Sequence, residues 1–82
     1  MEMIVQHEKN NQRFIIELDN GAEAELKYRL SGESGVDFYS TFVPNTHRGQ
    51  GHAELLVKTG IDWAKEQNLE MHASCWYARN FL

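Results

Sequence analysis

The sequence predicts an α+β fold, in which an antiparallel meander of three to four strands leads into one strand–helix–strand unit. Residues 1–44 alternate apolar and polar side chains between short turn signals, as half-buried strands do. Residues 51–67 repeat apolar side chains at helical spacing, and a β-type run, residues 70–75, follows. Because a strand–helix–strand unit of this length makes a parallel crossover, we expect a mixed sheet with a long helix and a short C-terminal helix.

Four segments have the alternation or the β-forming side chains of strands: residues 4–8, 14–18, 22–30 and 36–43. Polar turns separate them, including the hairpin signal Asp19-Asn20-Gly21 and a glycine-containing turn over residues 31–35. Pro44 ends the last of the four. Short turns imply that these strands pair antiparallel.

The long helix has one continuous apolar face, formed by Ala53, Leu56, Val57, Gly60, Ile61 and Ala64. Gly60 in a helix interior costs about 1 kcal/mol relative to Ala, so we expect it to mark a close approach of helix to sheet. Asn68 can take the left-handed position that ends the helix. Residues 70–75 are the predicted fourth strand when the short edge strand at residues 4–8 is not counted. Residues 76–82 are predicted to form a terminal helical turn or two.

Length, composition and charge exclude several classes of protein. A chain of 82 residues predicts a single domain over residues 1–82. The net charge is -4 and the basic residues are scattered, so we expect no nucleic-acid partner. No apolar run approaches the roughly 20 residues of a membrane span, so we expect no membrane partner. The single cysteine excludes an internal disulfide and favours a reducing, cytoplasmic location.

The informative motif is a glycine loop that joins the strand ending at Pro44 to the long helix. It comprises Arg48, Gly49, Gln50, Gly51, His52 and Ala53. No Ser, Thr, Asp or Asn stands where it could cap the helix, so the first backbone N–H groups are free. Free N–H groups at the positive end of a helix, beside the Arg48 cation, form an anion site, and glycines let a ligand approach the backbone. The loop therefore predicts a phosphate or pyrophosphate ligand.

Three other interpretations of the loop are weaker. A P-loop needs Gly-Lys-Ser/Thr before the helix, whereas here Gly51 is followed by His52 and Ala53. A dinucleotide site has three glycines opening a larger parallel sheet, and only Gly49 and Gly51 are present, after an antiparallel meander. A tight turn without a ligand would leave the helix start unsatisfied.

The pattern Arg48-x-x-Gly51-x-Ala53 resembles the Arg/Gln-x-x-Gly-x-Gly/Ala signature of the GCN5-related N-acetyltransferases (GNATs). Further segments similar to the small members of that family are residues 24–30, Thr41-Phe42-Val43-Pro44, the run from Trp63 to Leu69, and Cys75. The resemblance covers nearly the whole chain. It implies a small GNAT-like fold that binds acetyl-CoA.

The resemblance also implies roles for individual residues. The backbone amides of Arg48, Gly49, Gln50, Gly51, His52 and Ala53 would hold the coenzyme pyrophosphate. The strand before the loop, at Phe42 and Val43, would contact the pantetheine arm. Tyr77 and Asn80 are candidates to lie near the pantetheine arm, because they follow the next strand in the sequence. The implied function is transfer of acetyl from acetyl-CoA to an unknown small amine or protein acceptor. The alternatives are a module that binds acetyl-CoA or CoA without catalysis, and a structural domain.

Cys75 is the candidate catalytic residue. It ends a predicted strand before a predicted helical turn, and a helix N-terminus raises the thiolate fraction of a thiol, which could then accept an acetyl group. It could equally be a buried space-filling residue. For direct attack by the acceptor amine, the candidate bases are His72, Glu70 and Tyr39, and the sequence selects none.

The sequence also bears on a metal site and on the acceptor site. The four histidines lack the spacing of metal ligands, so we expect no metal site. Larger GNATs carry helices between their first strands, and these helices build much of the acceptor site. Here the turns at residues 19–21 and 31–35 stand in their place, so we expect an open acceptor site whose substrate the sequence does not identify.

Overall fold

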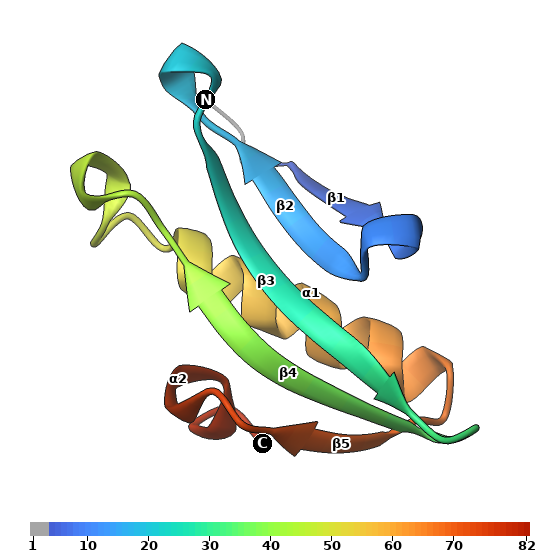
Figure 1. The fold of residues 1–82 in the computed structure, drawn as a ribbon. Coiled ribbons are helices and arrows are strands. Elements are labelled where there is room, and N and C mark those ends of the chain that lie inside the picture. The colour runs from blue at the N-terminus through green and yellow to red at the C-terminus, as the bar shows by residue number, and fades with distance from the viewer. Residues whose placement is uncertain (1–3) are drawn as a thin grey trace.

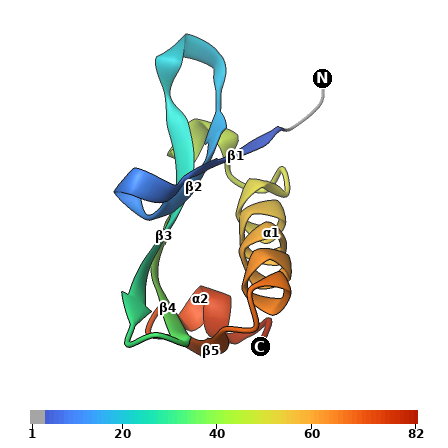
Figure 2. The same cartoon turned by 90° about the vertical axis from the view of Figure 1, so that its right-hand side faces the viewer.

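The computed structural model describes residues 4–82 as a five-stranded sheet with one long helix packed on a single face (Figures 1 and 2). The strands are β1 (Val5–Glu8), β2 (Arg13–Glu17), β3 (Glu23–Ser31), β4 (Gly35–Phe42) and β5 (Glu70–Ala73). The helices are α1 (His52–Glu66) and the short α2 (Trp76–Arg79), with 3-10 turns at Lys9–Asn11, Asp19–Gly21 and Asn45–His47.

The strands lie in sequence order across the sheet, β1-β2-β3-β4-β5. The first four pair antiparallel, and β5 pairs parallel to β4 with α1 as the connection between them. This confirms the predicted meander followed by one strand–helix–strand unit. In Figure 2, α1 stands on one side of the sheet.

Helix α1 has the predicted ends. It begins after Gly51, whose φ of 89° is left-handed, and no side chain caps it. At the other end Asn68 is left-handed, with φ of 57°, as its position after the helix predicted. Among residues 4–82, no helix is long and apolar enough to cross a membrane.

The core lies between α1 and the inner face of the sheet. The fully buried side chains there include Phe14, Leu26, Val36 and Phe38 from the strands and Leu56 and Val57 from the helix. Gly60 is buried in this interface: a Cβ atom on it would lie 3.0 Å from both Leu26 Cδ2 and Phe38 Cε1. The expectation that Gly60 marks close helix–sheet packing is therefore confirmed.

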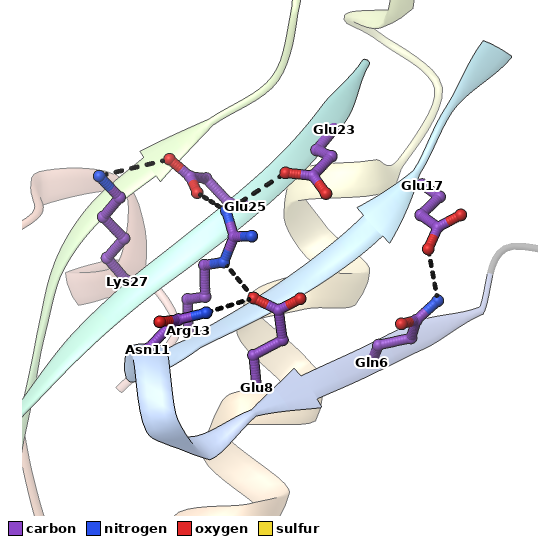
Figure 3. A network of polar contacts seen from close by, with 8 residues as sticks. All are labelled: Gln6, Glu8, Asn11, Arg13, Glu17, Glu23, Glu25 and Lys27. Carbon is purple, nitrogen blue, oxygen red and sulfur yellow. Dashed lines mark hydrogen bonds and ion pairs between the residues drawn. The ribbon is translucent and has the colours of Figure 1, made fainter. Parts of the chain in front are cut away.

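The outer face of the sheet is polar. Arg13 on β2 forms ion pairs with Glu8, Glu23 and Glu25, and Lys27 reaches Glu25 (Figure 3). Ile15 lies on this face yet is only 1% exposed; its register partners Gln6 and Glu25 carry long polar side chains. The alternating pattern did not predict a buried residue on this side.

The sheet opens where β4 and β5 separate. The two strands pair from Gly35↔Glu70 to Phe38↔Ala73. Beyond this point β4 continues to Phe42, whereas the segment after β5 turns into α2. A register shift between Lys27 and Tyr28 adds an irregularity to β4 at the same level, next to Tyr39. The strand predicted over residues 70–75 is therefore shorter, and Cys75 lies beyond its end rather than in it.

An aromatic cluster joins β1 to the core. His7 stacks on Phe14 at 4.0 Å between ring centroids and meets Trp63 edge-on at 4.9 Å. Its Nε2 lies 2.6 Å from the hydroxyl oxygen of Tyr28, which is 2% exposed. Burial, with a smaller contribution from Lys9, lowers the pKa of His7 below its usual value.

This lowered pKa predicts a stability that falls with acid. The unfolded chain takes up a proton at His7 more readily than the folded chain, so folding loses free energy as the pH drops below about 6.5. Between pH 7.5 and 5.5 the melting temperature should fall by about 3 °C more in the native protein than in His7→Gln. Thermal unfolding followed by circular dichroism measures this difference. An unchanged slope in His7→Gln would contradict the assignment.

Candidate functional site

A cleft of about 590 Å³ opens between the end of β4, the start of α1 and the turn into α2. Its lining comes from three separate stretches of chain: Thr41, Phe42 and Val43; His47, Arg48, Gly49, Gly51, His52, Ala53 and Glu54; and Cys75, Trp76 and Tyr77. The separation of β4 from β5 and the glycine loop therefore contribute to one site.

The glycine loop leaves backbone donors free at one end of the cleft. Gly49 and Gly51 both have left-handed φ, 81° and 89°, which side-chain-bearing residues rarely adopt. The first helical hydrogen bond runs from the Leu55 N–H to the Gly51 carbonyl, at 3.1 Å. The amides that precede Leu55 in α1 thus have no helical acceptor, and the positive end of a 15-residue helix faces the cleft.

Cationic and imidazole side chains gather at the same end. Arg48 donates its Nε–H to the Val43 carbonyl at 2.9 Å, which folds the side chain back over the loop and leaves the two terminal nitrogens of the guanidinium for a ligand. His52 is 6% exposed, and its Nδ1 atom is buried without a hydrogen-bond partner. The His47 ring lies 6.0 Å from it, edge-on.

Cys75 lies where the two strands separate. Its Sγ is 3.5 Å from the Thr41 hydroxyl oxygen, and it stands immediately before α2. Burial by itself raises the pKa of the Cys75 thiol, but hydrogen bonds from Thr41 and from the backbone of Ala78 and Tyr77 outweigh burial. The pKa of the thiol therefore lies below its ordinary value, which increases the thiolate fraction at neutral pH.

The end of the cleft near Cys75 is largely apolar. Phe42 and Trp76 line it with exposed fractions of 49% and 72%, and Tyr77 lies deeper. Burial, with a contribution from Glu54, raises the pKa of Tyr77, so its phenol stays neutral and can donate a hydrogen bond. The cleft thus joins an end with free backbone N–H groups and a guanidinium to an apolar end that carries a thiol.

Most of the residues predicted from the sequence line this cleft. Gln50 and Asn80 do not; both are exposed, and their roles stay predictions. The candidate bases also lie elsewhere. His72 and Glu70 are paired with each other on β5 at 3.5 Å, and Tyr39 packs under the Arg29 guanidinium.

Four lining residues were missed by sequence reasoning: Thr41, His47, Glu54 and Trp76. Thr41 stands in the quoted motif Thr41-Phe42-Val43-Pro44, but only the fold brings its hydroxyl to a cysteine 34 positions further along. The burial of the His52 ring was also missed, because the apolar face of the helix predicts core positions from Ala53 onward.

A meander that passes into one parallel strand pair, with a glycine loop opening the helix between them, is the arrangement of an acetyltransferase domain. Residues 13–82 match the family model described as GCN5-related N-acetyl-transferase. The chain belongs to the GCN5-related N-acetyltransferase family.

The relatives support this assignment over almost the whole chain. Protein NATD1 of Bos taurus is 36% identical over 80 residues, covering 95% of this chain and 70% of that protein. Protein NATD1 of Danio rerio is 35% identical over 79 residues, covering 95% and 72%. The solution structure of a GCN5-like protein from Staphylococcus aureus has a TM-score of 0.68 at 26% identity, over 96% of this chain and 76% of that one.

Proposed function

We propose that this protein binds acetyl-CoA in the cleft and transfers its acetyl group to an amine. The observation that carries the proposal is the position of Cys75 in the same cleft as the uncapped start of α1. An anion site at one end and a low-pKa thiol at the other match a ligand that carries phosphates at one end and a thioester at the other.

The pyrophosphate and the pantetheine arm of the coenzyme have suitable partners in this cleft. The free amides at the start of α1 and the Arg48 guanidinium would hold the pyrophosphate. The edge of β4 near Phe42 and Val43, freed by the separation from β5, would take the pantetheine arm. His52, whose Nδ1 atom is buried without a hydrogen-bond partner, also lines this end of the cleft.

The chemistry that fits Cys75 is a two-step transfer. The thiolate Sγ attacks the thioester carbonyl, a new carbon–sulfur bond forms, and the bond to the coenzyme sulfur breaks, so that coenzyme A leaves as a thiolate and is protonated by water. The acceptor amine then attacks the acetyl-cysteine; an amide forms, the amine loses a proton and the thiol is regenerated. The backbone N–H groups of Tyr77 and Ala78, which lower the pKa of the thiol, would stabilise the negative charge on the sulfur when the acetyl group leaves it.

Intact mass after incubation with acetyl-CoA tests this mechanism. The native protein should gain one acetyl group, and Cys75→Ala should gain none, because the chain has a single cysteine. Thermal unfolding with and without coenzyme A tests binding separately. Both proteins should be stabilised, by about 3 kcal/mol when coenzyme A is present at a hundred times its Kd.

The two measurements separate the alternatives. Stabilisation without any adduct would favour direct attack by the acceptor amine, or a module that binds without catalysis. An adduct that persists in Cys75→Ala would place the acetyl group elsewhere and overturn the role of Cys75. No stabilisation by coenzyme A would overturn the proposed site.

A further inference from the structure

The carboxylate of Asp37 on β4 binds the residue that precedes Cys75, Ser74, just after the end of β5. Its Oδ1 accepts a hydrogen bond from the backbone N–H of Ser74, and its Oδ2 accepts one from the Ser74 hydroxyl, both at 2.8 Å. Both oxygens of one carboxylate thus hold a single residue of the turn. Hydrogen bonds to an ionised carboxylate are stronger than those between neutral groups.

A second hydrogen bond joins the next residue of each segment. The Cys75 N–H donates to the Phe38 carbonyl at 3.1 Å, so the consecutive residues Asp37 and Phe38 hold Ser74 and Cys75. Beyond this point the two strands separate, and Thr41, further along β4, meets the Cys75 sulfur. The place of the thiol in the cleft therefore depends on contacts made on the opposite side of the turn.

The carboxylate of Asp37 is also supported from β3. Its side chain is 19% exposed, and the Arg29 Nε lies 3.8 Å from Oδ2. Arg29 is the register partner of Asp37 on β3 and rests over the Tyr39 ring, 4.3 Å from its centroid. The carboxylate is thus supported from β3 on one side and bonded to the turn on the other. It does not line the cleft that holds Cys75.

We infer that Asp37, acting through Ser74, is a positioning residue that holds the Cys75 thiol against Thr41 and the start of α2. The chemical consequence rests on the proposed function, because it concerns acetyl transfer to Cys75. The geometric part does not: a turn released from Asp37 should hold the sulfur less firmly in its hydrogen bonds, whatever the protein acetylates.

Alkylation of Cys75 by iodoacetamide, measured against pH, tests the inference without any coenzyme. Ser74→Ala removes the hydroxyl bond to Asp37 Oδ2 and keeps the backbone bond to Oδ1. The midpoint of the pH profile should move to higher pH in this variant, because the looser turn holds the sulfur less firmly against Thr41. Acetylation of Cys75 by acetyl-CoA should slow about fivefold, as expected for the loss of one hydrogen bond. Ser74→Thr keeps the hydroxyl and should restore the native midpoint. Asp37→Ala also removes a negative charge. Losing that charge by itself favours the thiolate and would lower the midpoint, so Ser74→Ala is the decisive variant.

Matched controls are available on the same strand and on the helix. Ser40→Ala lies on β4, and Asp62→Ala on the exposed side of α1; neither should move the alkylation midpoint. A native midpoint in Ser74→Ala, with the fold intact by circular dichroism, would overturn the inference. Failure of the native protein to bind coenzyme A would overturn the proposed function instead, and the alkylation profile would still decide the role of Asp37.

Discussion

Replacing Gly49 with aspartate should weaken binding of coenzyme A by about a hundredfold. In the proposed complex the loop offers backbone N–H groups and the Arg48 guanidinium to the phosphates, and a carboxylate placed there would repel them at short range. The site at Gly49 has room for the change, because an added Cβ would meet no atom within 4 Å. Isothermal titration calorimetry with coenzyme A gives the affinity.

Gly49→Asn is the matched control for this variant. Asn and Asp have the same shape, and both tolerate the left-handed φ of 81° found here better than other residues with side chains. Asn should therefore keep the affinity within a few-fold of the native value. Equal losses in the two variants would show that crowding, not charge, decides binding; native affinity in both would mean that the phosphates bind elsewhere.

Replacing Gly60 with leucine should destabilise the fold by about 3 kcal/mol or more. The inner surface of α1 touches the sheet at this position, and a single Cβ atom would already press on Leu26 and Phe38 at 3.0 Å. Both neighbours are fully buried and have little room to move. Urea denaturation gives the free energy of unfolding directly.

Two companions separate crowding from helix propensity. Gly60→Ala adds one atom and gains about 1 kcal/mol of propensity, so the two effects should nearly cancel. Asp62→Leu adds the same side chain on the exposed side of α1 and should change stability by less than about 0.5 kcal/mol. A native stability in Gly60→Leu would contradict the close packing described above.

Local patterns predicted the elements that local physics determines. The ends of α1 follow from Gly51 and Asn68, whose backbone conformations suit the start and the end of a helix. The free backbone N–H groups at the start of α1 follow from the same glycine and from the missing cap. The family resemblance added the coenzyme, which neither periodicity nor composition could name.

Tertiary contacts determined the features that the sequence did not predict. Leu30 continues the apolar alternation of β3, yet it is 52% exposed, since it lies near the turn before β4, beyond the last residue of β3 that pairs with β2. Cys75 falls outside β5 because the strand pairing stops at Ala73. The Asp37–Ser74 contact joins residues 37 positions apart, and no short motif signals it.

The two turns that replace larger insertions differ in where new sequence would be placed. Glu25 pairs with Phe42, so the turn Asp19–Gly21 lies at the same end of the sheet as the cleft, whereas the turn between β3 and β4 lies at the opposite end (Figure 1). Exposed turns tolerate insertion well. Under the proposed function, a recognition segment grafted between β2 and β3 would add acceptor contacts at the cleft's end of the sheet while the residues that line the cleft stay unchanged.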